Sequence, residues 1–270
     1  NVCPDQQAIS LQNPLSTEMS VMRPSILPGL LMTLQYNLNR QRDRVRLFET
    51  GLVFESLAGE TLQTRKIAGL LYGKSQPENW NQAKGSVDFF DAKGLVEMLL
   101  SAGAPIEPAQ FARGSHPSLH PGQSADIMIG SRVVGVVGAL HPRLQRELGL
   151  SQPAYLFELD SEPLLARTLP AAQALSRFPE VNRDIALVVD RDRAAGDIVR
   201  CITEQAGTNL KSLKVFDVYE GENLGQNKKS IAIGLTLQHP SRTLSDEEIS
   251  ATITSCINAL ANEFNAELRL

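Results

Sequence analysis

The chain has few cysteines, no long apolar run and no excess of basic residues, and each absence excludes a class of protein. Its three cysteines, Cys3, Cys201 and Cys256, cannot complete a disulfide framework, which indicates reduced core thiols. No apolar run approaches the roughly 20 residues of a bilayer-spanning helix, and the first seven residues lack the features of a secretion signal. We therefore expect a cytoplasmic protein with no membrane partner.

The charge balance limits how the chain could bind nucleic acid. Its 270 residues include 26 Lys and Arg against 30 Asp and Glu, a net charge of −4. This excludes a generic polyanion binder that works by bulk attraction, and we expect no DNA partner. The residues after Ser176 include 11 basic and 14 acidic side chains, a net charge of −3. Any RNA contact there must be local and depend on shape.

Familiar catalytic and metal-binding motifs are also missing. The sequence has no P-loop, dinucleotide fingerprint, Gly-x-Ser-x-Gly elbow or paired-cysteine motif, so we predict no catalytic residue and no metal ligand. Every histidine precedes a proline, which disfavours helical geometry, so His116 and His120 are not expected to share a helical face as zinc ligands. Alternating arginines could contact phosphates, although a solvated helix end and strand edge also explains them: Arg40, Arg42, Arg44 and Arg46.

Length and patterning favour two domains, because 270 residues exceed the usual size of one. We expect residues 1–166 to form the first domain, with helices packed on an antiparallel sheet, and residues 167–176 to form a linker. We expect a helix over 25–39 that Ser25 caps, and further helices over 87–102 and 142–148. Two strands, 44–48 and 52–55, are expected to form a hairpin through Glu49-Thr50-Gly51. The other expected strands are 66–72, 124–129, 133–140 and 154–159.

Residues 177–270 read as strand, helix, strand, strand, helix, strand, which is the ferredoxin-like βαββαβ pattern of an α+β protein. The first helix, near 195–206, presents Ile198, Cys201 and Ile202 on one stripe. Ser245 followed by Glu248 forms the sequence pattern of a capping box at the start of the second helix. Two helices would cover one face of the sheet and leave the other open.

The open face carries the candidate binding residues. In the strand 229–238 the large aliphatic residues alternate with small ones, so Ser230 and Ala232 face away from the core. In the strand 213–219 the alternation predicts Phe216 and Val218 inward, and Val215, Asp217 and Tyr219 outward. A carboxylate and an aromatic ring can bond a base edge and stack on its plane. An ordinary half-exposed sheet with a surface tyrosine fits the same pattern, and pattern alone does not imply function.

Several longer segments are distinctive enough to compare with known families. They are NPLSTEMSVMRPSILPGLLMTLQYNLNRQRDRVRLFETGLVF at 13–54, LHPGQSADI at 119–127, GALHP at 138–142, FPEVNRDIALVV at 178–189, FDVYEG at 216–221, KKSIAIGLTLQ at 228–238 and RTLSDEEI at 242–249. In this order they closely resemble the β subunits of bacterial phenylalanyl-tRNA synthetases. The resemblance implies a copy of the class II synthetase core followed by an anticodon-binding domain.

One departure from an active class II core is important. The strand that resembles 51–55 would carry an arginine for ATP and the amino acid carboxylate, and here that position is Glu55. No glycine-rich segment ending in arginine occurs near 154–165 either. The resemblance therefore implies a non-catalytic core that packs against the catalytic α subunit. ATP and magnesium would serve the complete enzyme, with no cofactor bound by this chain.

The resemblance also implies roles for residues of the open face. Asp217 and Tyr219 would read the anticodon of the phenylalanine tRNA, with Lys229, Ser230 and Ala232 as RNA-binding neighbours on or beside the adjacent strand. The family's editing module and magnesium-binding carboxylates would precede Asn1, as expected for a piece of a longer polypeptide. Two alternatives stay open: an assembly scaffold whose sheet is covered by protein, and a ferredoxin-like sensor of small molecules.

Overall fold

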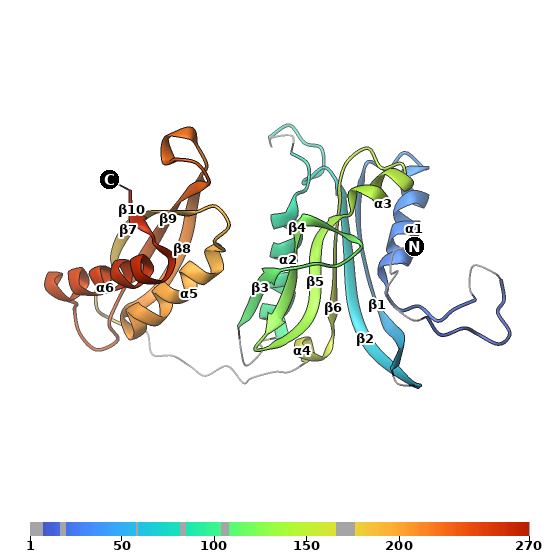
Figure 1. Cartoon of the computed structure of the whole chain (residues 1–270), viewed down its shortest axis with the longest axis horizontal. Helices are drawn as coiled ribbons and strands as arrows, with labels where there is room; N and C mark the ends of the chain where they lie inside the picture. Colours follow the sequence, from blue (N-terminus) through green and yellow to red (C-terminus); the bar gives the residue numbers. More distant parts are fainter. Residues whose placement is uncertain are drawn as a thin grey trace. The chain divides into compact units, whose positions relative to one another are not determined.

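The computed structural model describes residues 8–16, 20–57, 59–81, 85–103, 108–165 and 176–269. The chain divides into two compact units, Asn1–Leu169 and Pro170–Leu270, and each is described by itself (Figure 1). The division falls within the predicted linker, of which only Ser176 belongs to the described residues. None of the helices in the described ranges has the length and apolarity that crossing a bilayer requires.

The first unit is built on a six-stranded antiparallel sheet in the order β1-β2-β6-β5-β4-β3 (Figure 1). Its side chains alternate between two cores: on β6, Leu156 packs into one core, and its neighbours Tyr155 and Phe157 pack into the other. The strands are β1 (Arg44–Leu57), β2 (Glu60–Gly73), β3 (Ala109–Arg113), β4 (Leu119–Ile129), β5 (Arg132–Leu140) and β6 (Ala154–Asp160).

Helices cover both faces of this sheet. The helix predicted over 25–39 is confirmed as α1, whose Leu27, Leu30, Leu31 and Leu34 are all buried in the core that includes Leu156. The helix predicted over 87–102 is confirmed as α2, whose Ala92 and Val96 are buried in the second core. The helices of the unit are α1 (Leu27–Leu38), α2 (Phe89–Gly103), α3 (Pro142–Glu147) and α4 (Glu162–Leu165).

The predicted hairpin within residues 44–55 is wrong, because β1 is one continuous strand. It pairs with β2 in an unbroken ladder from Arg44 opposite Gly73 to Leu57 opposite Glu60. Gly51, taken as a turn signal, lies in the middle of that ladder. A methyl group there would lie 2.0 Å from Nη2 of Arg23, so the glycine provides room for an arginine side chain rather than a turn.

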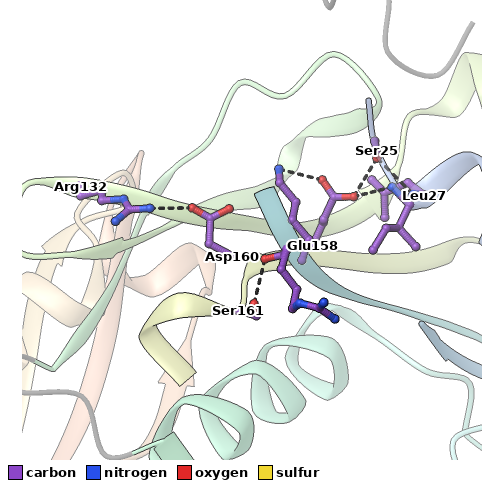
Figure 2. Close-up of polar contacts among 9 residues, drawn as sticks. Ser25, Leu27, Arg132, Glu158, Asp160 and Ser161 are labelled. Atoms are coloured by element: carbon purple, nitrogen blue, oxygen red, sulfur yellow. Dashed lines mark hydrogen bonds and ion pairs between the residues drawn. The ribbon is translucent and has the colours of Figure 1, made fainter. Parts of the chain in front are cut away.

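Ser25 lies at the N-terminus of α1 as predicted, where its Oγ accepts from the backbone N of Leu27 at 3.1 Å, and a buried carboxylate from a distant strand caps the same helix end. Oε1 of Glu158 accepts hydrogen bonds from the backbone N of Ile26 at 2.7 Å and from Oγ of Ser25 at 2.9 Å (Figure 2). Oε2 of the same residue lies 3.2 Å from Nζ of Lys66. Negative charge at the positive end of a helix is favourable, so Glu158 joins α1, β2 and β6 at one point.

Structural partners are present for the four histidines and, among the alternating arginines, for Arg40 and Arg46. In each His-Pro turn the imidazole Nδ1 accepts from the backbone N–H two residues further on, which stabilises the turn. No group of three potential metal ligands occurs among the described residues. Arg46 donates to the carbonyls of Tyr72 and Lys74 at 2.7 and 2.6 Å, and the guanidinium of Arg40 lies 3.4 Å from the ring centroid of Tyr36.

The second unit is the predicted ferredoxin-like βαββαβ fold, with an antiparallel sheet in the order β10-β7-β9-β8 (Figure 1). Its two helices bury Ile198, Ile202, Cys256 and Leu260 against one face of that sheet. The elements are β7 (Val181–Asp190), α5 (Ala195–Ala206), β8 (Leu210–Tyr219), β9 (Lys228–Leu237), α6 (Asp246–Phe264) and β10 (Glu267–Leu268), with short 3-10 turns at Gly207–Asn209 and Glu222–Leu224.

The predicted capping box of α6 is confirmed. Oγ of Ser245 accepts from the backbone N of Glu248 at 3.3 Å, and Oε2 of Glu248 accepts from the backbone N of Ser245 at 3.0 Å. Nη1 of Arg242 donates to the same carboxylate at 2.5 Å. The bond from Arg242, together with that from Ser245, lowers the pKa of Glu248 to about 2.

Candidate nucleic-acid interface

The candidate interface is the face of the second unit's sheet that lies opposite α5 and α6. Strand β9 runs through its centre, where Ala232 lies between Ala186 of β7 and Asp217 of β8. Ser230, the neighbouring residue of β9 on the same face, lies between Val188 of β7 and Tyr219 of β8. The alternation of β9 is as predicted, because Ile231 and Ile233 are buried in the core on the helix side. Small residues therefore line the middle of the open face.

A β-bulge in β8 changes which side chains reach this face. Val215 lies opposite Ile233 and Asp217 lies opposite Ala232, so Phe216 is an additional residue in the strand. The predicted directions of Val215 and Phe216 are wrong: Val215 packs against the core, and Phe216 is 52% exposed. Val218 lies opposite the core residue Ile231, on the predicted inner side, yet is half exposed.

The extra residue of the bulge adds an aromatic ring to the open face. A methyl group on Gly234 would lie 3.7 Å from Cδ1 of Phe216 and 3.2 Å from Oδ1 of Asp184. Phe216 and Asp184 therefore both lie above Gly234, on the same side as Asp217. No sequence signal marks Phe216 as a surface residue, because strand alternation places it in the core.

Tyr219 and Asp217 are placed on the open face, as predicted. The Tyr219 side chain lies close to two other residues. A methyl group on Gly221 would lie 2.1 Å from the tyrosine hydroxyl oxygen, and Cζ of Arg269 lies 5.0 Å from the ring centroid. With 38% of its surface exposed, Tyr219 is oriented by its neighbours and still accessible to a ligand.

Two of the predicted RNA-binding residues, Ser230 and Lys229, are on the predicted strand but are not exposed on the open face. Ser230 is on the correct side of β9 but is only 3% exposed, so its hydroxyl is not available at the surface. Lys229 lies opposite the core residue Val189, on the helix side, where Nζ donates to the carbonyl of Arg193 at 2.7 Å. Burial lowers the pKa of Lys229. The structure therefore brings Asp217, Tyr219 and Ala232 together, without the ammonium of Lys229.

Within the described part of the chain, five of the eleven basic side chains after Ser176 form ion pairs with carboxylates. Arg269 is absent from the ion pairs found among the described residues, and its side chain lies on the open face. No sequence signal marks Arg269 as a residue of this face, because only the pairing of β10 with β7 brings it there. The pairs are Arg191–Glu220, Arg200–Asp197, Lys211–Glu180, Lys228–Glu267 and Arg242–Glu248.

Comparison with known proteins gives matches for both units. A family model described as the phenylalanyl tRNA synthetase beta chain CLM domain matches residues 2–161, and one described as the ferredoxin-fold anticodon binding domain matches residues 176–269. The phenylalanine–tRNA ligase β subunit of Pseudomonas fluorescens is 46% identical over 266 residues, that of Thiobacillus denitrificans 44% and that of Hahella chejuensis 42%. Each alignment covers 98% of this chain and 34%, 33% and 33% of the respective relative.

The fold and these matches define an aminoacyl-tRNA synthetase chain whose second unit is a ferredoxin-fold anticodon-binding domain. At the identity and coverage observed, the chain belongs to the family of phenylalanine–tRNA ligase β subunits. It spans about one third of the length of the curated relatives that it matches.

Proposed function

We propose that this chain is the part of a phenylalanine–tRNA ligase β subunit that binds the anticodon region of the tRNA and holds the catalytic α subunit. The observation that carries the RNA-binding role is the open face of the second unit, where Tyr219 and Asp217 project beside Ala232. A ring that presents one face to solvent can stack on a base. A carboxylate beside it can accept hydrogen bonds from a base edge.

Phe216 extends this surface. Its ring lies on the same side as Asp217 and is 52% exposed, so a carboxylate stands between two aromatic residues along one strand. Two rings allow two unstacked bases to be held while the carboxylate discriminates between them. Ala232 and Gly234 contribute by being small, since a large residue at either position would prevent a base from lying close to the sheet.

The first unit supplies no reacting group in this proposal. The Glu55 carboxylate stands where an active class II core would place an arginine, and it would repel a triphosphate. No group of three potential metal ligands occurs in the described ranges. In this proposal ATP and magnesium would act on the α subunit of the complete ligase. Free, buried Cys201 and Cys256 are consistent with a cytoplasmic location.

Binding of phenylalanine tRNA to the 270-residue chain tests the RNA-binding role. We expect Tyr219→Ala to weaken binding by about 1–3 kcal/mol, the usual contribution of base–aromatic stacking. Tyr36→Ala is a matched control, because Tyr36 is also an exposed tyrosine beneath an arginine but belongs to the first unit. Equal binding by the wild type and Tyr219→Ala, with both proteins folded, would contradict the proposal.

Asp217→Asn distinguishes sequence-specific recognition of the anticodon from non-specific binding of tRNA. Since a carboxylate bonded to a base edge gives discrimination, the substitution should narrow the difference in affinity between phenylalanine tRNA and tRNAs with altered anticodons. Overall affinity should change less than that difference. If the ratios stay at their wild-type values for every anticodon position, the open face is covered by protein in the assembled enzyme and the chain is an assembly scaffold.

A further inference from the structure

The last described residue, Arg269, lies on the open face and reaches across it. Its backbone N donates to the carbonyl of Ala186 at 2.8 Å, continuing the pairing in which Leu268 lies opposite Leu187. Leu187 points into the core, so Arg269 shares the open side with Ala186. From this edge of the sheet its guanidinium extends over β7 and β9 to within 5.0 Å of the Tyr219 ring centroid on β8.

The small residues of the face make this reach possible. The positions between Arg269 and β8 are Ala186 and Ala232, which are paired with each other across β7 and β9. Neither has a side chain large enough to block an arginine that lies along the sheet. The Arg269 guanidinium therefore stays next to the residue that the proposed function places against a base.

Charge gives this placement a consequence for RNA. The residues after Ser176 carry a net charge of −3, and Asp184 and Asp217 both lie on the open face. A phosphodiester brought close to these carboxylates is repelled unless a cation compensates. Lys228, which shares this side of β9 with Ser230, is paired with Glu267 at 3.1 Å. Lys214 lies opposite Gly234, about 13 Å along β9 from Ser230 and hence from Tyr219.

We propose that Arg269 binds the phosphate of the nucleotide whose base stacks on Tyr219. This inference rests on the proposed function and names a further RNA-binding residue for it. A guanidinium presents a planar fork that matches phosphate oxygens, and its attraction to a ring in water is weaker than its bond to an anion. In the free chain Arg269 rests on the ring; in the complex it moves to the phosphate while the base takes its place on the ring.

The test measures binding of an RNA hairpin with a phenylalanine anticodon loop to the 270-residue chain over a series of KCl concentrations. Each phosphate contact contributes about 0.7–0.9 to the slope of log K against log salt. We expect Arg269→Gln to weaken binding several-fold at low salt and to reduce the slope by about that amount, while Arg269→Lys keeps the slope. Arg200→Gln, on a helix that packs against the other face, removes the same charge and should change neither value.

The outcomes are distinguishable. If Tyr219→Ala weakens binding while Arg269→Gln has wild-type affinity and slope, the phosphate contact is overturned and the proposed function stands. If Arg269→Gln and Arg269→Lys weaken binding equally with an unchanged slope, Arg269 only orients the ring, and the proposal is also overturned. If the wild type does not distinguish this hairpin from one with a scrambled loop, the proposed function fails, and the phosphate contact fails with it. Thermal unfolding of each variant confirms that it is folded.

Discussion

At the scale of single residues, the orientation of one ring decides what the open face can bind. The Tyr219 hydroxyl lies next to Gly221, and the guanidinium of Arg269 lies next to the Tyr219 ring. The cation–π contact of an exposed arginine is worth about 0.5–1 kcal/mol, less than the roughly 1–3 kcal/mol of a stacked base. A base can therefore displace the arginine. The absence of a side chain at Gly221 leaves room for the ring in this position, and Arg269 leaves the ring accessible.

Substitution of Gly221 tests this arrangement. Its φ of −137° is available to any residue, so alanine introduces no backbone strain, and the added methyl group would meet the tyrosine hydroxyl at 2.1 Å. We expect Gly221→Ala to turn the ring away and to weaken RNA binding by up to the roughly 1–3 kcal/mol of a stacked base. The thermal unfolding midpoint should change little. Unchanged RNA affinity would show that the ring position is unimportant.

At the scale of single elements, two helices begin with carboxylate caps that differ in origin. The α6 cap is local, since Ser245 and Glu248 belong to the same turn. The α1 cap comes from Glu158 on β6, far along the sequence and nearly buried. A local cap stabilises its own helix, whereas the distant cap couples a helix to the sheet beneath it, so the two should respond differently to substitution.

The α6 cap predicts a dependence of stability on pH. The folded pKa of Glu248 is lowered from 4.5 to about 2, so its stabilising contribution is present above pH 4.5 and is lost as the pH falls through about 2. We expect the difference in urea midpoint between the wild type and Glu248→Gln to be largest above pH 4.5 and to disappear toward pH 2. A difference that stays constant over this range would show that the charge of Glu248 does not contribute.

The buried cap of α1 predicts a larger effect. Removing one partner of a buried ion pair leaves the other uncompensated, so Glu158→Ala should lower the free energy of unfolding by about 3–5 kcal/mol. Glu158→Gln should cost less, because its amide oxygen can still accept from Ile26 while the ion pair with Lys66 is lost. Denaturant unfolding of both variants decides the point. Equal effects of the two would mean that the charge of Glu158, and not its packing or the hydrogen bond that an amide retains, makes the residue important.

At the scale of the whole molecule, the first unit presents features of an association surface. β1 is an edge strand of 14 residues, and long edges are usually protected. Arg23 covers part of this edge through bonds with Leu52 and Phe54. Elsewhere Phe48 is 77% exposed, and Met32 on the neighbouring helix α1 is 65% exposed. We infer that the region around β1 and α1 is where the α subunit packs.

Two methionines provide a matched test of that inference. Met32 on α1 and Met98 on α2 are both 65% exposed and both lie within helices. We expect Met32→Glu to reduce co-purification with the α subunit strongly, because it introduces a charge into an apolar contact, and Met98→Glu to leave co-purification intact. Circular dichroism checks that both variants are folded. If Met32→Glu and Phe48→Glu both associate normally, the interface lies on another surface.

The sequence by itself determined the features that depend on neighbours along the chain. Helical spacing of leucines defined α1, the order of strands and helices predicted the ferredoxin-like unit, and Ser245 with Glu248 marked the start of α6. Strand alternation placed Asp217 and Tyr219 on the open face. These predictions succeeded because side-chain periodicity and helix capping depend only on residues a few positions apart in the sequence.

Only the tertiary structure decided the features that depend on partner strands. The bulge that turns Phe216 outward exists in the pairing of β8 with β9, and the continuity of β1 past Gly51 exists in its pairing with β2. The capping of α1 by Glu158 and the placement of Arg269 on Tyr219 join residues far apart in sequence. Side-chain periodicity along one strand contains no information about the strand beside it, and that neighbour determines register, burial and contact.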